Sequence, residues 1–106
     1  MSLPAHDLRF SLALLRAPKV GPRTFKALLR RFGTPAQVFA APSSAFADLG
    51  LGKETREWLA RPDWRKVDAD LRWLDLPGHH CLPLEDEAYP APLREIADPP
   101  PLLFVA

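Results

Sequence analysis

The order of apolar and polar residues predicts a series of short helices over positions 1–76. Two apolar stripes follow the spacing of a helix that buries one face. The first predicts a helix from a capping Asp7 to about Arg16, and the second predicts a helix that ends at Gly33. The stripes are Leu8, Leu12 and Leu15, then Phe25, Leu28, Leu29 and Phe32.

Capping signals predict further helices. Thr34 opens a capping box that closes at Gln37, and Asp63 is placed to cap the longest of the later helices. Three tryptophans lie on these helices at a spacing that is more typical of core packing than of base stacking. The expected helices span residues 34–41, 43–49, 53–60 and 63–76, and the tryptophans are Trp58, Trp64 and Trp73.

The pattern changes to strands and proline-rich turns from residue 79 onward. The segment His80–Leu84 predicts a strand, 89–96 a helical turn, and the continuous apolar run Leu102–Val105 a strand covered on both faces. Such a strand needs a sheet, which the chain does not complete before Ala106, so we expect an N-terminal fragment of a longer α/β protein or a truncated chain. Its edges predict that it folds back on the helices, pairs with His80–Leu84, or self-associates with another chain.

Two glycine turns each lead into a helix. The resulting order of helices resembles a double helix-hairpin-helix unit, whose turns read apolar, any residue, Gly, apolar, Gly. The turn Leu49–Gly52 holds both glycines, whereas Lys19 occupies the first glycine position of the earlier turn. Acidic residues around the later turn repel a polyanion, so the earlier turn is the better candidate for binding.

The formal net charge of +1 hides an uneven distribution. Seven basic residues and no acidic residue lie between Leu8 and Ala47, and the later part of the chain is acidic. Such a segment suits the binding of a polyanion, although a solvated helix face also explains a run of charge. The seven are Arg9, Arg16, Lys19, Arg23, Lys26, Arg30 and Arg31.

The basic segment contains a turn that can hold a phosphate. Gly21 can adopt a backbone conformation that other residues avoid, Pro22 fits the first position of the helix, and the amides of residues 23–25 are then free to donate. We therefore expect phosphate contacts that do not depend on base sequence. The expected nucleic-acid-binding residues are Lys19, Gly21, Arg23, Thr24, Lys26 and Arg30.

Other chemistry has little support in the sequence. We find no catalytic motif, Walker loop or dinucleotide fingerprint, so we expect no enzyme and no cofactor. His79, His80 and Cys81 are adjacent and lack a second cluster, so no metal site is expected; Cys81 is interpreted as a small buried hydrophobe, and the acidic run 85–87 as a solvated turn. A single cysteine, with no bilayer-length apolar run and no secretory signal, predicts a cytoplasmic protein without a membrane segment.

Two segments resemble the DprA/Smf family, the DNA-processing proteins of natural transformation. One joins the Val20-Gly21-Pro22 turn to the helix end at Gly33, and the other runs from Asp86 to Val105. The resemblance implies a helical SAM-like or helix-hairpin-helix-like domain over 1–76, followed over 77–106 by a linker and the first strand elements of a truncated Rossmann-like domain. The second segment carries Tyr89-Pro90, Leu93, and Ile96-Ala97-Asp98-Pro99-Pro100. The expected fold class is thus mainly α, with one or two strands of an incomplete α/β domain.

The resemblance also implies a function. Proteins of the family bind single-stranded DNA, protect it and help to load RecA, which makes this chain an N-terminal accessory module with weak phosphate contacts from its first hairpin and basic helix. The family's main nucleic-acid pocket and dimer surface belong to the Rossmann-like domain beyond Ala106, so no binding residue is transferred from them. The alternative is a SAM-like protein-interaction module that does not bind DNA.

Overall fold

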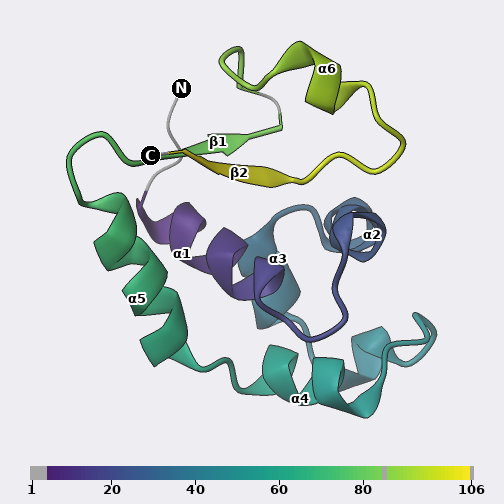
Figure 1. Ribbon diagram of the computed structural model, residues 1–106. Helices are drawn as coiled ribbons and strands as arrows, with labels where there is room; N and C mark the ends of the chain where they lie inside the picture. The colour runs from purple at the N-terminus through teal and green to yellow at the C-terminus, as the bar shows by residue number, and fades with distance from the viewer. Residues whose placement is uncertain (1–4, 85, 106) are drawn as a thin grey trace.

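The computed structural model describes residues 5–84 and 86–105. Within them it contains six α-helices, one 3₁₀ helix and a two-stranded antiparallel sheet, which confirms the mainly helical fold class (Figure 1). The elements are α1 (Ala5–Leu15), α2 (Pro22–Phe32), α3 (Pro35–Ala40), η1 (Ser43–Phe46), α4 (Lys53–Ala60), α5 (Trp64–Leu74), β1 (His80–Pro83), α6 (Ala91–Arg94) and β2 (Leu102–Val105).

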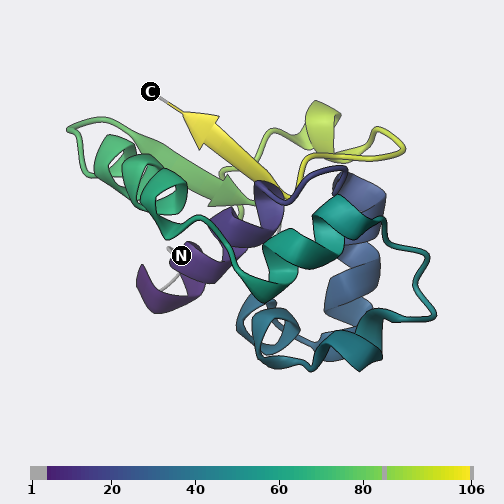
Figure 2. The ribbon, with the colours of Figure 1, turned by 90° about the horizontal axis from the view of Figure 1, so that it is seen from below.

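Helix α1 lies at the centre of the molecule. Its consecutive residues Leu12, Ala13 and Leu14 are each at most 1% exposed, because the helix is covered from two sides. Leu14 packs into a cluster with residues of α2, α3 and α4, whereas Leu12 and Ala13 pack with Val67 of α5 and Leu102 of β2. Figures 1 and 2 show the sheet on one side of α1 and α4 on the other. An apolar stripe at helical spacing identifies only part of such a central helix.

Most of the expected helix boundaries are confirmed. The Gln37 amide donates to Thr34 Oγ1 at 3.2 Å and the Thr34 amide donates to Gln37 Oε1 at 3.0 Å, which completes the capping box. The Asp63 carboxylate accepts a hydrogen bond from the Arg65 amide at the start of α5. Gly33 ends α2 with a φ of 100°, a conformation that favours glycine.

Two expectations about helix ends were wrong. Helix α1 begins at Ala5, so Asp7 lies inside its first turn instead of capping it; the helix begins three residues before Leu8, the first residue of the leucine stripe. The expected helix over 43–49 is a single 3₁₀ turn, Ser43–Phe46, which buries the Phe46 side chain.

Two side-chain hydrogen bonds attach α4 to the first hairpin. The Thr55 hydroxyl donates to the Pro18 carbonyl oxygen at 2.6 Å, and the Trp58 indole N–H donates to the Ala13 carbonyl oxygen at 2.7 Å. Thr55 is only 2% exposed, so neither its hydroxyl nor the carbonyl it binds can exchange this bond for water at low cost. These bonds fix the position of the second hairpin relative to the first.

The sheet pairs the two expected strands and packs on the helices. β1 and β2 are antiparallel, with His80 opposite Val105 and Pro83 opposite Leu102. The buried Leu102 joins the cluster around α1 and α5, so the apolar run both pairs with the earlier strand and folds back on the helical part. The expectation that both of its faces are covered was wrong for the described chain, because Phe104 stays 40% exposed.

The tryptophans and the cysteine have mainly structural surroundings. Trp58 and Trp64 pack against the core clusters, whereas Trp73 is exposed and stacks on the His79 ring at a centroid distance of 4.0 Å. Cys81 packs against the cluster around α1, and its burial raises the pKa of the thiol to about 11. The Cys81 thiol is therefore protonated at neutral pH. This agrees with its interpretation as a small hydrophobic side chain and not a nucleophile.

We expect Thr55→Val to lower the free energy of unfolding by about 1–3 kcal/mol, because the substitution keeps the shape of the side chain but leaves the Pro18 carbonyl oxygen without its partner. Urea denaturation followed by circular dichroism measures the change. The matched control is Ser44→Ala at an exposed position, where a change within about 0.5 kcal/mol is expected. Equal effects of the two substitutions would show that the Thr55 bond does not hold the hairpins together.

Candidate nucleic-acid interface

The two glycine turns have the same backbone geometry. Lys19 has a φ of 60° and Gly50 a φ of 68°, and each is followed two residues later by a glycine in extended conformation that precedes a helix. Gly21 has a φ of −87° and Gly52 a φ of −70°. The first turn therefore forms the same hairpin as the second, with a lysine in the left-handed conformation that glycine adopts in the second.

The left-handed backbone conformation expected at Gly21 occurs two residues earlier, at Lys19. The extended backbone of Gly21 is open to any residue, and a Cβ added there would meet no atom within 4 Å. The expectation that Gly21 supplies a conformation closed to other residues was therefore wrong. The constraint lies at Lys19, where the lysine side chain is attached to a backbone conformation that costs an L-residue about 1–2 kcal/mol.

Helix α2 presents two backbone donors in its first turn. Pro22 is the first helical residue and has no N–H, and Gly21 provides no side-chain cap. The Phe25 amide donates to the Gly21 carbonyl oxygen at 2.9 Å, so the expectation that it is available for a phosphate was wrong. The amides of Arg23 and Thr24 come before this first intrahelical bond, at the positive end of the helix dipole.

A cleft of about 400 Å³ separates the two hairpins. Lys19, Arg23 and Thr24 line it from the first hairpin, and the Gly50–Gly52 turn and Thr55 line it from the second. The cleft thus joins three of the expected binding residues to a turn that the sequence analysis discounted for its acidic neighbours. The repetition of the glycine turn in the sequence was the one feature that could have identified the Gly50–Gly52 turn as part of the cleft.

The other expected residues lie elsewhere on α2. Gly21 precedes the helix at the edge of the turn, whereas Lys26 lines a different groove, between α2 and the segment before β2. Arg30 is exposed one turn farther along and lines neither hollow. The structure therefore gathers part of the expected set at the hairpin cleft and places Lys26 and Arg30 away from it.

Four of the seven basic side chains in the N-terminal segment form ion pairs with acidic residues from later in the chain. Because these pairs neutralise charge locally, the uneven charge of the sequence is largely balanced in three dimensions. The two hydrogen bonds that the Arg16 guanidinium donates to the Asp70 carboxylate also raise the pKa of Arg16. The pairs are Arg9 with Asp68 at 3.3 Å, Arg16 with Asp70 at 2.6 Å, Arg23 with Asp98 at 2.9 Å, and Arg31 with Asp48 at 3.1 Å.

Three basic side chains of the segment, Lys19, Lys26 and Arg30, form no ion pair with any described residue. Lys19 is therefore the unpaired positive charge at the hairpin cleft. The side chain of Arg23, also at the cleft, is 81% exposed, and its Nε donates to both Asp98 carboxylate oxygens, at 2.9 and 3.0 Å. A phosphate at the cleft would compete with Asp98 for this guanidinium.

The candidates for other chemistry have structural contacts or lie outside the described residues. His79 Nδ1 is 2.7 Å from the Trp73 carbonyl oxygen, and the described residues hold no group of three metal-ligating side chains. Within the acidic turn, the Ala88 amide donates to the Asp86 carboxylate and lowers its pKa, and Glu85 lies outside the described residues. In the part of the chain that the structure describes, no helix has the length and apolar character needed to cross a membrane.

Comparison with known proteins finds similarity over about half of the chain. Residues 6–49 match the family model described as the DprA-like N-terminal HHH domain. Over 53 residues, or 50% of this chain, the sequence is 34% identical to Protein Smf of Escherichia coli (strain K12). The matched segment covers 14% of that protein, so the chain spans a small part of the curated relative. No solved structure matches the chain.

We expect Lys19→Gly to stabilise the chain by about 0.5–1 kcal/mol, because glycine relieves the left-handed backbone and loses part of that gain as chain entropy. Lys19→Ala removes the same charge but keeps a Cβ, so it is the matched control and should give no such gain. Gly50→Ala should lower the free energy of unfolding by about 1 kcal/mol at the equivalent position. Urea denaturation measures all three, and equal stabilities of the glycine and alanine variants at position 19 would contradict the shared hairpin geometry.

Proposed function

We propose that this chain, whose residues 6–49 match the family model of the DprA-like N-terminal HHH domain, is the accessory module of a DNA-processing protein that binds single-stranded DNA. In this proposal the whole protein acts in the cytoplasm, protects incoming DNA during natural transformation and helps to load RecA. The module adds weak phosphate contacts that do not depend on base sequence and has no catalytic activity of its own. Residues 1–76 form its helical domain, and residues 77–106 form a linker and the first strands of a Rossmann-like domain.

The hairpin cleft is the observation that carries the proposal. Two helices with uncapped N-termini meet there, and the unpaired Lys19 and the exposed Arg23 guanidinium lie on the same wall. Backbone donors at a helix N-terminus together with basic side chains suit a phosphate and carry no information about the base. We assign direct contacts to Lys19, Arg23, Thr24 and the turn at Gly21. Lys26 and Arg30 add positive potential from the rest of α2.

The proposed contacts are few, so binding should be weak and sensitive to salt. About three phosphates neutralised on a single strand give a slope of roughly −2 for the logarithm of the association constant against the logarithm of salt concentration. The ion pair between Arg23 and Asp98 lowers the affinity further, since a phosphate must displace a carboxylate from the same guanidinium. The acidic Glu54 in the first turn of α4 weakens the second wall of the cleft.

A SAM-like protein-interaction module is the second candidate. It is favoured by the position of Lys26, which faces an apolar groove instead of the hairpin cleft. The two candidates assign different faces of α2 to the partner, so substitutions on each face distinguish them.

We expect Asp98→Asn to raise the affinity for a labelled oligothymidylate about two- to fivefold at low salt, because it releases Arg23 for phosphate. Lys19→Glu should lower the affinity about tenfold by placing a negative charge at the cleft. Fluorescence anisotropy at two salt concentrations measures both effects.

Two matched substitutions serve as controls. Asp48→Asn removes the partner of Arg31 in a similar ion pair away from the cleft, and Lys66→Glu reverses an exposed lysine on α5. Neither should change the affinity by more than about twofold. If Lys19→Glu and Lys66→Glu weaken binding equally, the hairpin cleft is not the binding site. If no variant and no salt concentration gives binding, the module does not bind DNA by itself.

A further inference from the structure

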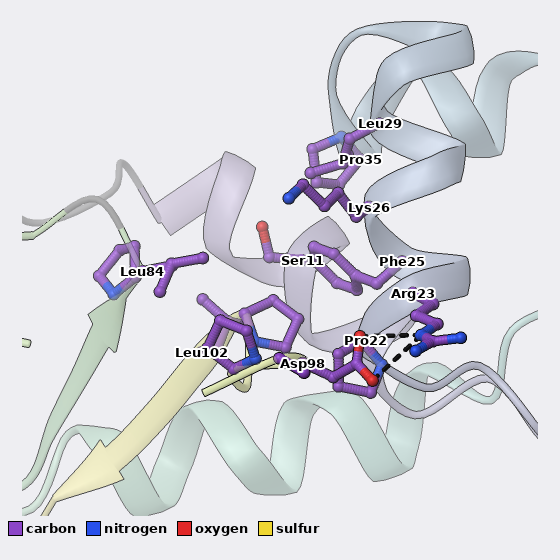
Figure 3. Close-up of a pocket in the computed structure, with 14 residues that line it drawn as sticks. Ser11, Pro22, Arg23, Phe25, Lys26, Leu29, Pro35, Leu84, Asp98 and Leu102 are labelled. Atoms are coloured by element: carbon purple, nitrogen blue, oxygen red, sulfur yellow. Dashed lines mark hydrogen bonds and ion pairs between the residues drawn. The ribbon is translucent and has the colours of Figure 1, made fainter. Parts of the chain in front are cut away.

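An apolar groove of about 270 Å³ lies on the face of α2 opposite the hairpin cleft. Phe25 and Leu29 of α2 form one wall, and Leu84 with the proline-rich segment before β2 forms the other. Figure 3 shows these side chains facing one another across the hollow, with the ion pair of Arg23 and Asp98 at one end. The volume is close to that of one large side chain and falls just below the usual range for small-molecule pockets, which begins at about 300 Å³.

The proline-rich wall is held in place by specific hydrogen bonds. The buried Tyr89 hydroxyl donates to the Pro100 carbonyl oxygen at 2.8 Å, and the Leu84 amide donates to the Pro101 carbonyl oxygen at 3.0 Å. Asp98 then attaches the same segment to α2 through Arg23. A wall with prolines and three such attachments is preorganised, so a ligand would not have to order it on binding.

Ser11 gives the groove a neutral polar group on the α1 side, in addition to the charged Arg23, Lys26 and Asp98. The residue is 5% exposed and lines the groove from α1, and its hydroxyl has no hydrogen-bond partner among the described residues. In Figure 3 it lies between Phe25 and Leu84. No buried side-chain nitrogen or oxygen lacks a partner among the described residues, so the Ser11 hydroxyl is accessible at the groove surface, where it can donate to or accept from a ligand group.

Charge at the rim indicates the sign of the ligand. Lys26 lines the groove, Arg30 follows it one helical turn later on the same face of α2, and neither forms an ion pair with a described residue. The Arg23 charge at the other end is already balanced by Asp98. Two unpaired positive charges along one side favour an extended segment with several carboxylates over a single small anion.

We infer that this groove binds an acidic peptide segment of a partner protein through one large aromatic side chain that has a polar edge, such as tryptophan or tyrosine. The ring fills the apolar hollow, its N–H or O–H meets the Ser11 hydroxyl, and flanking carboxylates meet Lys26 and Arg30. Tryptophan and tyrosine combine a large apolar surface with such a polar group and are common anchors at protein interfaces. The inference does not depend on DNA binding by the hairpin cleft.

The groove suits a nucleic-acid base less well. Base binding without sequence preference relies on exposed aromatic faces for stacking. Phe25 is the aromatic residue in the groove lining, and it is 5% exposed because its ring is packed in the core. A base would meet prolines and aliphatic side chains in the hollow, with no exposed aromatic face in the described lining on which to stack.

The test is an NMR titration of the ¹⁵N-labelled chain with the blocked peptide Glu-Asp-Trp-Asp-Glu. The amides of Ser11, Leu84 and Ala97 should shift, with a Kd on the order of 1 mM or tighter for a single anchor side chain. The same peptide with alanine in place of tryptophan should bind at least about tenfold more weakly. No shift at these amides at about 10 mM peptide, or equal binding of the two peptides, would overturn the inference.

Variants separate the charge and hydroxyl contributions. Lys26→Glu should weaken the tryptophan peptide about tenfold, whereas Lys66→Glu on α5 should leave the affinity unchanged. Ser11→Ala should weaken the tryptophan peptide about threefold but not a peptide with leucine at the same position. Equal effects of the two lysine variants would contradict the role of the rim. Stronger shifts of the groove amides with oligothymidylate than with peptide would show that the occupant is nucleic acid.

Discussion

The structure depends on the attachment of α4 to the first hairpin through the buried Thr55 and the partly buried Trp58. Thr55 and Trp58 both donate to backbone oxygens of α1 and the turn that follows it, at 2.6 and 2.7 Å. Each bond satisfies a backbone carbonyl that the turn would otherwise leave unpaired, so the bonds stabilise the turn and orient the second hairpin at once. The width of the hairpin cleft and the composition of its walls follow from this contact.

Ion pairs within the fold use some of the basic side chains and leave others available for a ligand. Aspartates from later segments reach back to arginines of the basic segment, and the sheet segment is attached to α2 in this way through Asp98. Among the described residues, the basic side chains of the segment without an ion pair are Lys19, in the turn before α2 at the cleft, and Lys26 and Arg30, on the face of α2 toward the apolar groove. One short helix therefore separates a face suited to phosphate from a face suited to an acidic peptide.

The local elements could be predicted from the sequence because their signals are local. The Thr34 capping box, the Gly33 helix end and the strand at Leu102–Val105 each depend on residues whose preferences are strong without tertiary context, whereas the pairing of that strand with His80–Pro83 was one of three alternatives. The binding surface could not be predicted as fully, because the partners of Arg23 and Arg31 come from distant segments. The left-handed backbone conformation of Lys19 could not be predicted either, because lysine seldom adopts it. The repeated glycine turn was the one feature of the sequence that indicated it.

The most direct test of the account is whether both hairpins contact DNA together. The measurement is a map of amide shifts in the ¹⁵N-labelled chain on addition of a short oligothymidylate at low salt. The account predicts that the amides of residues 19–21, 23 and 24 and those of residues 50–52 shift in parallel with one binding curve. Shifts confined to one hairpin, shifts centred on the sheet, or no shifts at any salt concentration would contradict a shared phosphate site at the cleft.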